Sequence, residues 1–220
     1  MTEQDEAARL VKLRGLDLLD SAQEPQFDVI AAEAAARAGT VGSRITLVDE
    51  HRQWFKAGIA MDKRETPLSE SICAHAMRGD EPFVVPDAQL DERFRDIPGV
   101  AEGAIRFYAG VPLRLRDGTR LGTLCVFDEE RRDGLDGDER LALETLARRT
   151  VAAFELRREM RRDAVADPAD GIVSEEVWRE HAAELLAKAA VALERAGEGE
   201  ALAHLEQVVA LVEAKADDAG

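Results

Sequence analysis

Two strand-like stretches separated by one tight turn constrain the fold of this chain more than any other feature. Residues 106–116 and 119–128 are rich in side chains that favour strands, and only Asp117 and Gly118 lie between them. An Asp-Gly pair in this setting is a strong hairpin signal, because both central positions of such a turn take positive φ angles. The sequence therefore predicts two antiparallel strands at the centre of a sheet.

Further strands and several helices are expected around this hairpin. Strand-rich stretches at 43–49 and 53–59 predict a second hairpin, and 83–85 predicts a brief strand. Apolar residues at helical spacing predict helices at 3–20, 27–38 and 136–162, and a short internal helix at 70–77 with Ser69 as its N-cap. Helices that flank an antiparallel sheet are typical of an α+β domain.

The predicted elements divide the chain into one domain and an appendage. A chain of 220 residues, 45% of them hydrophobic, can bury the core of one ordinary domain, which we place at 1–165. A helix-breaking linker follows at 166–173, and apolar spacing predicts a helical hairpin at 174–220. Because the two patterns are self-contained, we expect the domain to stay folded when 174–220 are removed.

The negative charge of the chain limits its partners. The formal net charge is -16 and the pI is about 4.7, so few basic groups are available to displace counterions from phosphate. We expect no nucleic-acid partner and no membrane partner. The first residues, Met1 to Glu6, have neither the basic start nor the apolar stretch of a signal peptide, which predicts a cytoplasmic location.

A series of motifs resembles one family of sensory domains. In chain order they are LVDEHRQWFKA at 47–57, RETPLS at 64–69, CAHA at 73–76, VVPDA at 84–88, RFRD at 93–96, IRFYAGVPL at 105–113 and LGTLCVFD at 121–128. From about residue 6 to residue 162 the chain resembles the bacterial GAF domains that precede sensor histidine kinases and diguanylate cyclases. So many matches in the same order make an accidental similarity improbable.

This resemblance implies a sheet of five or six strands with a helical bundle on one face and a small ligand cavity on the other. GAF domains use this cavity for cyclic nucleotides, haem, bilins, amino-acid-like metabolites or no known ligand, so the ligand and any cofactor stay unknown. The chain has no Gly-rich phosphate loop, no Gly-x-Ser-x-Gly and no His-Glu-x-x-His. We therefore expect a small-molecule or partner sensor without a catalytic output of its own.

We place the cavity between the Tyr108 face of the predicted sheet and the segment 66–94. Strand alternation should point Tyr108, Thr123 and Cys125 inward, while their neighbours face the helices. The predicted ligand-binding residues are Trp54, Ser71, Cys73, His75, Asp87, Phe94, Tyr108, Thr123 and Cys125. On this hypothesis Cys125→Phe should abolish ligand binding at little cost in stability.

The cysteines keep a second class of function open. Cys73 and Cys125 are the only two cysteines and lack zinc-site spacing, so each is either a small buried apolar residue or a reactive thiol. Bilin-carrying GAF domains usually place His directly after the attaching Cys, whereas Ala74 here precedes His75. The alternative function is a redox-active cysteine enzyme or switch of the free methionine sulfoxide reductase type. No second ligand accompanies His75 at metal spacing, so no metal is expected.

The apolar stripes of the terminal helices predict a homodimer, because one sheet face cannot cover them all. The partners expected are an unidentified small-molecule ligand, a second copy of the chain, and a separate signalling protein such as a histidine kinase or a cyclase. Ligand occupancy would shift the helices at 3–20 and 136–162.

Overall fold

The computed structural model describes residues 3–59 and 63–166 of the chain. The chain divides into two compact units, Met1–Met160 and Arg161–Gly220, and the features below belong to the first. Apart from residue 166, the predicted linker at 166–173 lies outside the described residues, as does the predicted helical hairpin at 174–220. Both stay predictions.

The first unit is built on a six-stranded antiparallel sheet in the order β3-β2-β1-β6-β5-β4. Its strands are β1 (Gly42–Val48), β2 (Arg52–Ile59), β3 (Glu65–Pro67), β4 (Phe83–Val85), β5 (Phe107–Arg114) and β6 (Arg120–Asp128). The predicted α+β fold is therefore confirmed. The predicted strands all form within one or two residues of their expected ends, and the two predicted hairpins are β1-β2 and β5-β6.

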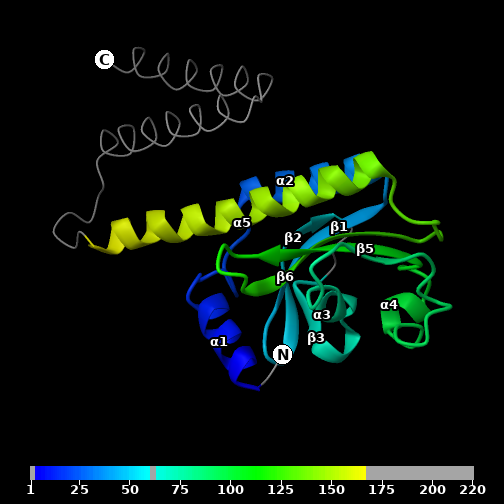
Figure 1. Cartoon of the computed structure of the whole chain (residues 1–220), viewed down its shortest axis with the longest axis horizontal. Helices are drawn as coiled ribbons and strands as arrows, with labels where there is room; N and C mark the ends of the chain where they lie inside the picture. The colour runs from blue at the N-terminus through cyan, green and yellow to red at the C-terminus, as the bar shows by residue number, and fades with distance from the viewer. Residues whose placement is uncertain (1–2, 60–62, 167–220) are drawn as a thin grey trace, which may run out of the picture. The chain divides into compact units, whose positions relative to one another are not determined.

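The helices lie on both faces of this sheet. They are α1 (Glu3–Arg14), α2 (Pro25–Ala38), the 3-10 turn η1 (Leu68–Glu70), α3 (Ile72–Ala76), α4 (Pro98–Ala101) and α5 (Gly137–Ala166). Figure 1 shows α2 and α5 side by side along one face, here called the helical face, with α3 on the opposite or cavity face. Phe27 of α2 and Phe154 of α5 join the two long helices, with ring centroids 5.2 Å apart.

Three local details differ from the sequence-based expectations. The first helix ends at Arg14 instead of Asp20, because Asp17 and Asp20 take positive φ angles of 52° and 57°, which a helix does not allow. The cap of α3 is Ser71 instead of Ser69. Its hydroxyl oxygen accepts from the Ala74 backbone N–H at 3.0 Å.

The turn between β5 and β6 also differs in its geometry. Gly118 has a φ of 86°, but Asp117 does not have a positive φ. The backbone N–H of Gly118 donates to the Leu115 carbonyl at 2.9 Å, and the N–H of Leu115 donates to Thr119 at 2.9 Å. The loop is therefore longer than two residues, and glycine is needed only at its last position.

Strand alternation divides the interior into two apolar clusters. Every second residue of β5, from Phe107 to Leu113, packs under the helices, together with Leu124 and Val126 of β6. Tyr108 and Cys125 belong to the cluster on the cavity face. Both assignments were expected from the alternation, and both are confirmed.

An ionic network is buried on the helical face. Lys56 is fully buried at a bulge in β2, where the β1-β2 register shifts between Ile45 and Thr46. Its ammonium group donates to Ser21 Oγ and to the Ala22 carbonyl, both at 2.8 Å, and pairs with Glu24. Arg157 of α5 donates to the same carboxylate at 2.8 Å. One carboxylate thus joins β2, α5 and the α1–α2 connection.

Candidate functional site

A cluster of hydroxyl and thiol groups lies buried on the cavity face. Tyr108 of β5 donates its hydroxyl hydrogen to Cys73 Sγ of α3 at 3.2 Å, and its oxygen is 3.5 Å from Thr123 Oγ1 of β6. Cys73 Sγ is 3.8 Å from Cys125 Sγ, which is 4.0 Å from Thr46 Oγ1. We call these side chains the thiol–hydroxyl cluster. All of them are nearly inaccessible to solvent.

The position of Tyr108 depends on Gly110. A Cβ atom added at Gly110 would lie 2.4 Å from the Tyr108 hydroxyl oxygen and 2.9 Å from the ring carbon that carries it. The ring therefore lies across Gly110, and only glycine leaves this space open. Gly110 is also the register partner of Cys125, so the same small residue brings the hydroxyl group to the two thiols.

The space left inside the cluster is small. Its cavity has a volume of about 30 Å³, room for about one water-sized molecule. The residues that line it are Arg44, Gln53, Phe55, Glu70, Ile72, Cys73, Ile97, Ile105, Tyr108, Cys125 and Phe127. A cavity does lie where the sequence placed one, but no cyclic nucleotide, haem or bilin fits in it as it stands.

The surroundings of the cluster shift the pKa values of its two thiols in opposite directions. Hydrogen bonding with Cys125, Thr123 and Tyr108 holds the pKa of Cys73 below the ordinary thiol value, although burial opposes this. The interaction with Cys73 and burial raise the pKa of Cys125. Burial and the neighbouring thiols also raise the pKa of Tyr108, so its hydroxyl stays a donor.

Residues 65–76, from β3 to α3, cover this cluster and are here called the cover. Backbone pairing with β2 holds residues 65–67 of the cover. Gln53 of β2 adds side-chain bonds: its amide donates to Thr66 Oγ1 at 2.6 Å, and its amide oxygen accepts from Ser71 Oγ at 2.6 Å. Gln53 and Thr46 were missed from the sequence. Strand alternation was the available signal, since Thr46 is the register partner of Thr123.

Trp54 does not line the cavity, so the prediction that it belongs to the site is wrong. It lies in the apolar cluster of the helical face, where the Lys56 ammonium is 6.0 Å and the Arg64 guanidinium 5.0 Å from its ring centroid. The reason is strand alternation in β2: Gln53 and Phe55 line the cavity, so Trp54 between them faces the helices.

Three other predicted residues lie on the cavity face but outside the cavity. Phe94 is buried in the apolar cluster, and the ring of exposed His75 meets it edge-on at 5.1 Å. Partial burial and the positive charges of Arg78 and Arg93 lower the pKa of His75. Asp87 pairs with Arg106 and accepts from the Gln89 backbone N–H at 3.2 Å. None of these three side chains lines the cavity.

The predicted set is therefore brought together only in part. Cys73, Tyr108 and Cys125 line the cavity, and Thr123 contacts Tyr108. Ser71 lies beside it as the cap of α3 and the partner of Gln53.

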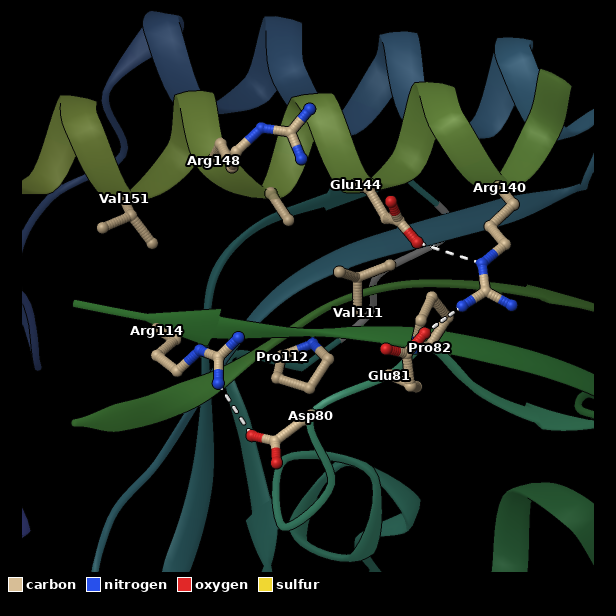
Figure 2. Close-up of a pocket in the computed structure, with 11 residues that line it drawn as sticks. Asp80, Glu81, Pro82, Val111, Pro112, Arg114, Arg140, Glu144, Arg148 and Val151 are labelled. Atoms are coloured by element: carbon tan, nitrogen blue, oxygen red, sulfur yellow. Dashed lines mark hydrogen bonds and ion pairs between the residues drawn. The ribbon is translucent and has the colours of Figure 1, made fainter. Parts of the chain in front are cut away.

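Larger hollows occur on the surface, and several of the charged groups that line them are paired with each other. One of about 470 Å³ lies between α5 and β5, and Figure 2 shows Arg140 reaching between Glu144 and Glu81 there, with Arg114 bonded to Asp80 below. A second, of about 650 Å³, has Lys12 bonded to Asp117 at 2.6 Å. A charged ligand would have to displace these partners. A third, of about 460 Å³, is lined by Trp54, Arg64 and Glu65 among others.

Within residues 3–59 and 63–166, no cluster of His, Cys, Asp and Glu has an arrangement that would hold a metal ion. No helix of the same part of the chain has the length and apolar character needed to cross a membrane.

Comparison with known proteins identifies the architecture. The family model described as GAF domain matches residues 13–154. A cyclic di-GMP phosphodiesterase of Pseudomonas aeruginosa is 43% identical over 150 residues, which is 68% of this chain and 26% of that protein. The chain thus spans about a quarter of the length of this curated relative.

Solved structures share the fold at low sequence identity. The GAF domain of a phosphoenolpyruvate-protein phosphotransferase from Coxiella burnetii has a TM-score of 0.54 at 15% identity, covering 73% of this chain and 98% of that one. A free methionine-R-sulfoxide reductase from Neisseria meningitidis, in complex with its substrate, has a TM-score of 0.51 at 18% identity, covering 73% and 95%.

Proposed function

Because the chain belongs to the GAF domain family, we propose that it is a cytoplasmic sensory domain that regulates a signalling output and has no catalytic output of its own. The identity to the Pseudomonas phosphodiesterase supports this, because it is confined to a segment that makes up 26% of that enzyme. So small a share suits an input domain better than the whole hydrolytic machinery.

The observation that carries the proposal is the buried thiol–hydroxyl cluster beneath a separately held cover. Buried hydroxyl and thiol groups cost stability unless they are bonded, and an apolar core would avoid this cost. A polar cluster next to a small cavity therefore suits a receptive site. Any ligand larger than about one water must move the cover, and this movement is the signal.

The output passes through the long helices, and we place a homodimer contact on their outer side. Val29 of α2 and Leu141 of α5 are 56% and 59% exposed there. The partner is a second copy, together with a signalling enzyme such as a histidine kinase or an enzyme that makes or degrades cyclic di-GMP. Light scattering should give a mass near twice 24.1 kDa. A mass of 24.1 kDa at every concentration contradicts the dimer.

The regulatory role is tested in a chimera in which residues 1–166 replace the matched segment of the Pseudomonas phosphodiesterase. Gln53→Leu removes the side-chain bonds from Gln53 to Thr66 and Ser71 of the cover while keeping the size of the side chain. It should change the rate of cyclic di-GMP hydrolysis severalfold, whereas Gln23→Leu, at an exposed glutamine, should leave the rate unchanged. Equal rates in all three chimeras refute the proposal.

A bound small molecule is sought separately, by native mass spectrometry of the full chain purified from its own host. A mass excess that disappears on denaturation identifies a ligand. The Gln53→Leu variant should lose this excess, and Gln23→Leu should keep it.

A further inference from the structure

The two cysteines lie side by side in the core although 52 residues separate them along the chain. Cys73 belongs to the short helix α3 of the cover, and Cys125 belongs to the central strand β6. Their Sγ atoms are 3.8 Å apart, both are free thiols, and the cavity of about 30 Å³ touches both.

We propose that Cys73 and Cys125 are a redox pair that hydrogen peroxide converts into a reversible intramolecular disulfide. A disulfide bond is about 2.05 Å long, so the two sulfur atoms must approach by about 1.8 Å from their present separation of 3.8 Å. The cavity beside α3 leaves space for this helix of five residues to shift toward β6.

The chemistry balances with hydrogen peroxide as the oxidant. The Cys73 thiol gives up its proton, the thiolate attacks one peroxide oxygen, an S–O bond forms, the O–O bond breaks, and the leaving hydroxide takes up that proton to become water. Cys125 Sγ then attacks the sulfur of the sulfenic acid, and the second water leaves with the Cys125 proton. Two thiols and one peroxide give one disulfide and two waters. A dithiol reductant returns two electrons and two protons and restores both thiols.

The surroundings assign different roles to the two sulfur atoms. The Tyr108 hydroxyl donates to Cys73 Sγ at 3.2 Å, which favours the thiolate that attacks peroxide. Cys125 Sγ lies farther from a hydroxyl group, 4.0 Å from Thr46 Oγ1, and the interaction with Cys73 and burial raise the pKa of Cys125. Cys73 is therefore the peroxide-reactive residue and Cys125 the resolving residue, while Tyr108 is a positioning residue.

The cavity also selects the oxidant by size. A volume of about 30 Å³ admits a molecule close to the size of water, which includes hydrogen peroxide. Glutathione and tert-butyl hydroperoxide are much larger and reach Cys73 only if the cover opens. Rapid reaction should thus be limited to hydrogen peroxide.

The disulfide would bind the cover covalently to the central strand. Its effect on signalling rests on the proposed function, because it would fix the segment whose movement is the signal. The disulfide itself is independent of any output.

The test uses the full reduced chain, treated with hydrogen peroxide and analysed after denaturation. We expect intact mass to fall by two hydrogen atoms, both thiols to become unreactive to N-ethylmaleimide, and a proteolytic peptide linking Cys73 to Cys125 to appear. The oxidised protein should melt at a higher temperature, and dithiothreitol should reverse all changes. tert-Butyl hydroperoxide at the same concentration should react much more slowly.

Three variants separate the roles. Cys125→Ser should stop at a sulfenic acid on Cys73 that dimedone traps, and Cys73→Ser should leave Cys125 unoxidised. Tyr108→Phe keeps the ring and should slow the reaction roughly tenfold, the effect of one hydrogen bond to a thiolate. It should also move the pH profile of the rate upward, which a purely structural role of Tyr108 would not do.

The proposal is overturned if the folded wild type keeps two reactive thiols in peroxide, or if the linked peptide joins two chains. These outcomes need no variant, so they hold even if a serine variant fails to fold. If the thiols stay free while Gln53→Leu still changes hydrolysis in the chimera, the redox pair fails and the proposed function stands. If the disulfide forms but Gln53→Leu leaves hydrolysis unchanged in the chimera, the redox pair stands and the proposed function fails.

Discussion

Replacing Glu24 by Gln should lower the free energy of unfolding by about 3 kcal/mol, because removing one partner of a buried ion pair typically costs about 3–5 kcal/mol. The carboxylate neutralises Lys56 and Arg157, whose side chains are 0% and 9% exposed. The low end of the range applies, because Glu24 itself is 23% exposed and Lys56 keeps its bonds to Ser21 and Ala22.

Urea unfolding of the full chain under reducing conditions measures this loss. For a domain of this size, about 3 kcal/mol corresponds to a fall of roughly 6–12 °C in melting temperature. The matched control is Glu33→Gln, which removes exposed ion pairs to Arg149 at 2.9 Å and to Arg37 at 3.7 Å and should cost less than about 1 kcal/mol. In a double-mutant cycle, Lys56→Met should cancel part of the loss, because it removes one stranded cation.

The pH dependence of this loss follows from the pKa of Glu24. Burial works to raise that pKa, but Lys56 and Arg157 outweigh it and hold the folded-state value below the ordinary 4.5. The stabilisation is therefore fully present above pH 4.5 and is lost as the pH falls through the lowered value. The gap between wild type and Glu24→Gln should close in that acidic window.

This reasoning is refuted if Glu24→Gln lowers the free energy of unfolding by no more than Glu33→Gln does. In that case the network on the helical face would be no stronger than a surface ion pair. A gap that stays constant down to acidic pH would exclude the carboxylate charge as its source.

Three further predictions concern the core and the appendage. Gly110→Ala should cost about 1–3 kcal/mol in urea unfolding, because its Cβ would lie 2.4 Å from the Tyr108 hydroxyl; Gly118→Asn, at an open position with φ of 86°, is the control and should cost less. Cys125→Phe should also cost about 1–3 kcal/mol, since a cavity of about 30 Å³ cannot take a phenyl ring; an unchanged melting temperature would restore the open pocket expected from the sequence. Deleting residues 174–220 should leave a cooperative thermal transition, and its loss would show that the appendage belongs to the core.

The sheet was predictable from local pattern because its longer strands are runs of residues that favour strands, buried on both faces, and two of these runs meet at Asp117 and Gly118. The strand β3 was missed, since its three residues are too few to show a period and depend on pairing with β2. The early end of α1 was missed because apolar spacing continues beyond Arg14, where the backbone leaves the helix at Asp17.

The candidate site was predictable only in part. Alternation placed Tyr108 and Cys125 on the cavity face, but the same rule, applied to β2, would have placed Trp54 on the helical face. The contact between Cys73 and Cys125 had no local signal, because it depends on how α3 packs against β6. The cavity volume depends on the packing of side chains from several strands and loops, which no sequence period encodes.

Strand β2 connects the two polar features of the domain. Gln53 at its start bonds the cover on the cavity face, and Lys56, three residues later, bonds Glu24 on the helical face. The bulge at Lys56 shifts the β1-β2 register between Ile45 and Thr46. A displacement of β2 would therefore move the Lys56 ammonium relative to the Glu24 carboxylate that neutralises it. Since Arg157 of α5 shares that carboxylate, movement of the cover has a short physical route to the long helix. If the chain has the proposed sensory role, this route would carry its output, because β2 is bonded to the cover by Gln53 and to α5 through Lys56 and the shared Glu24 carboxylate.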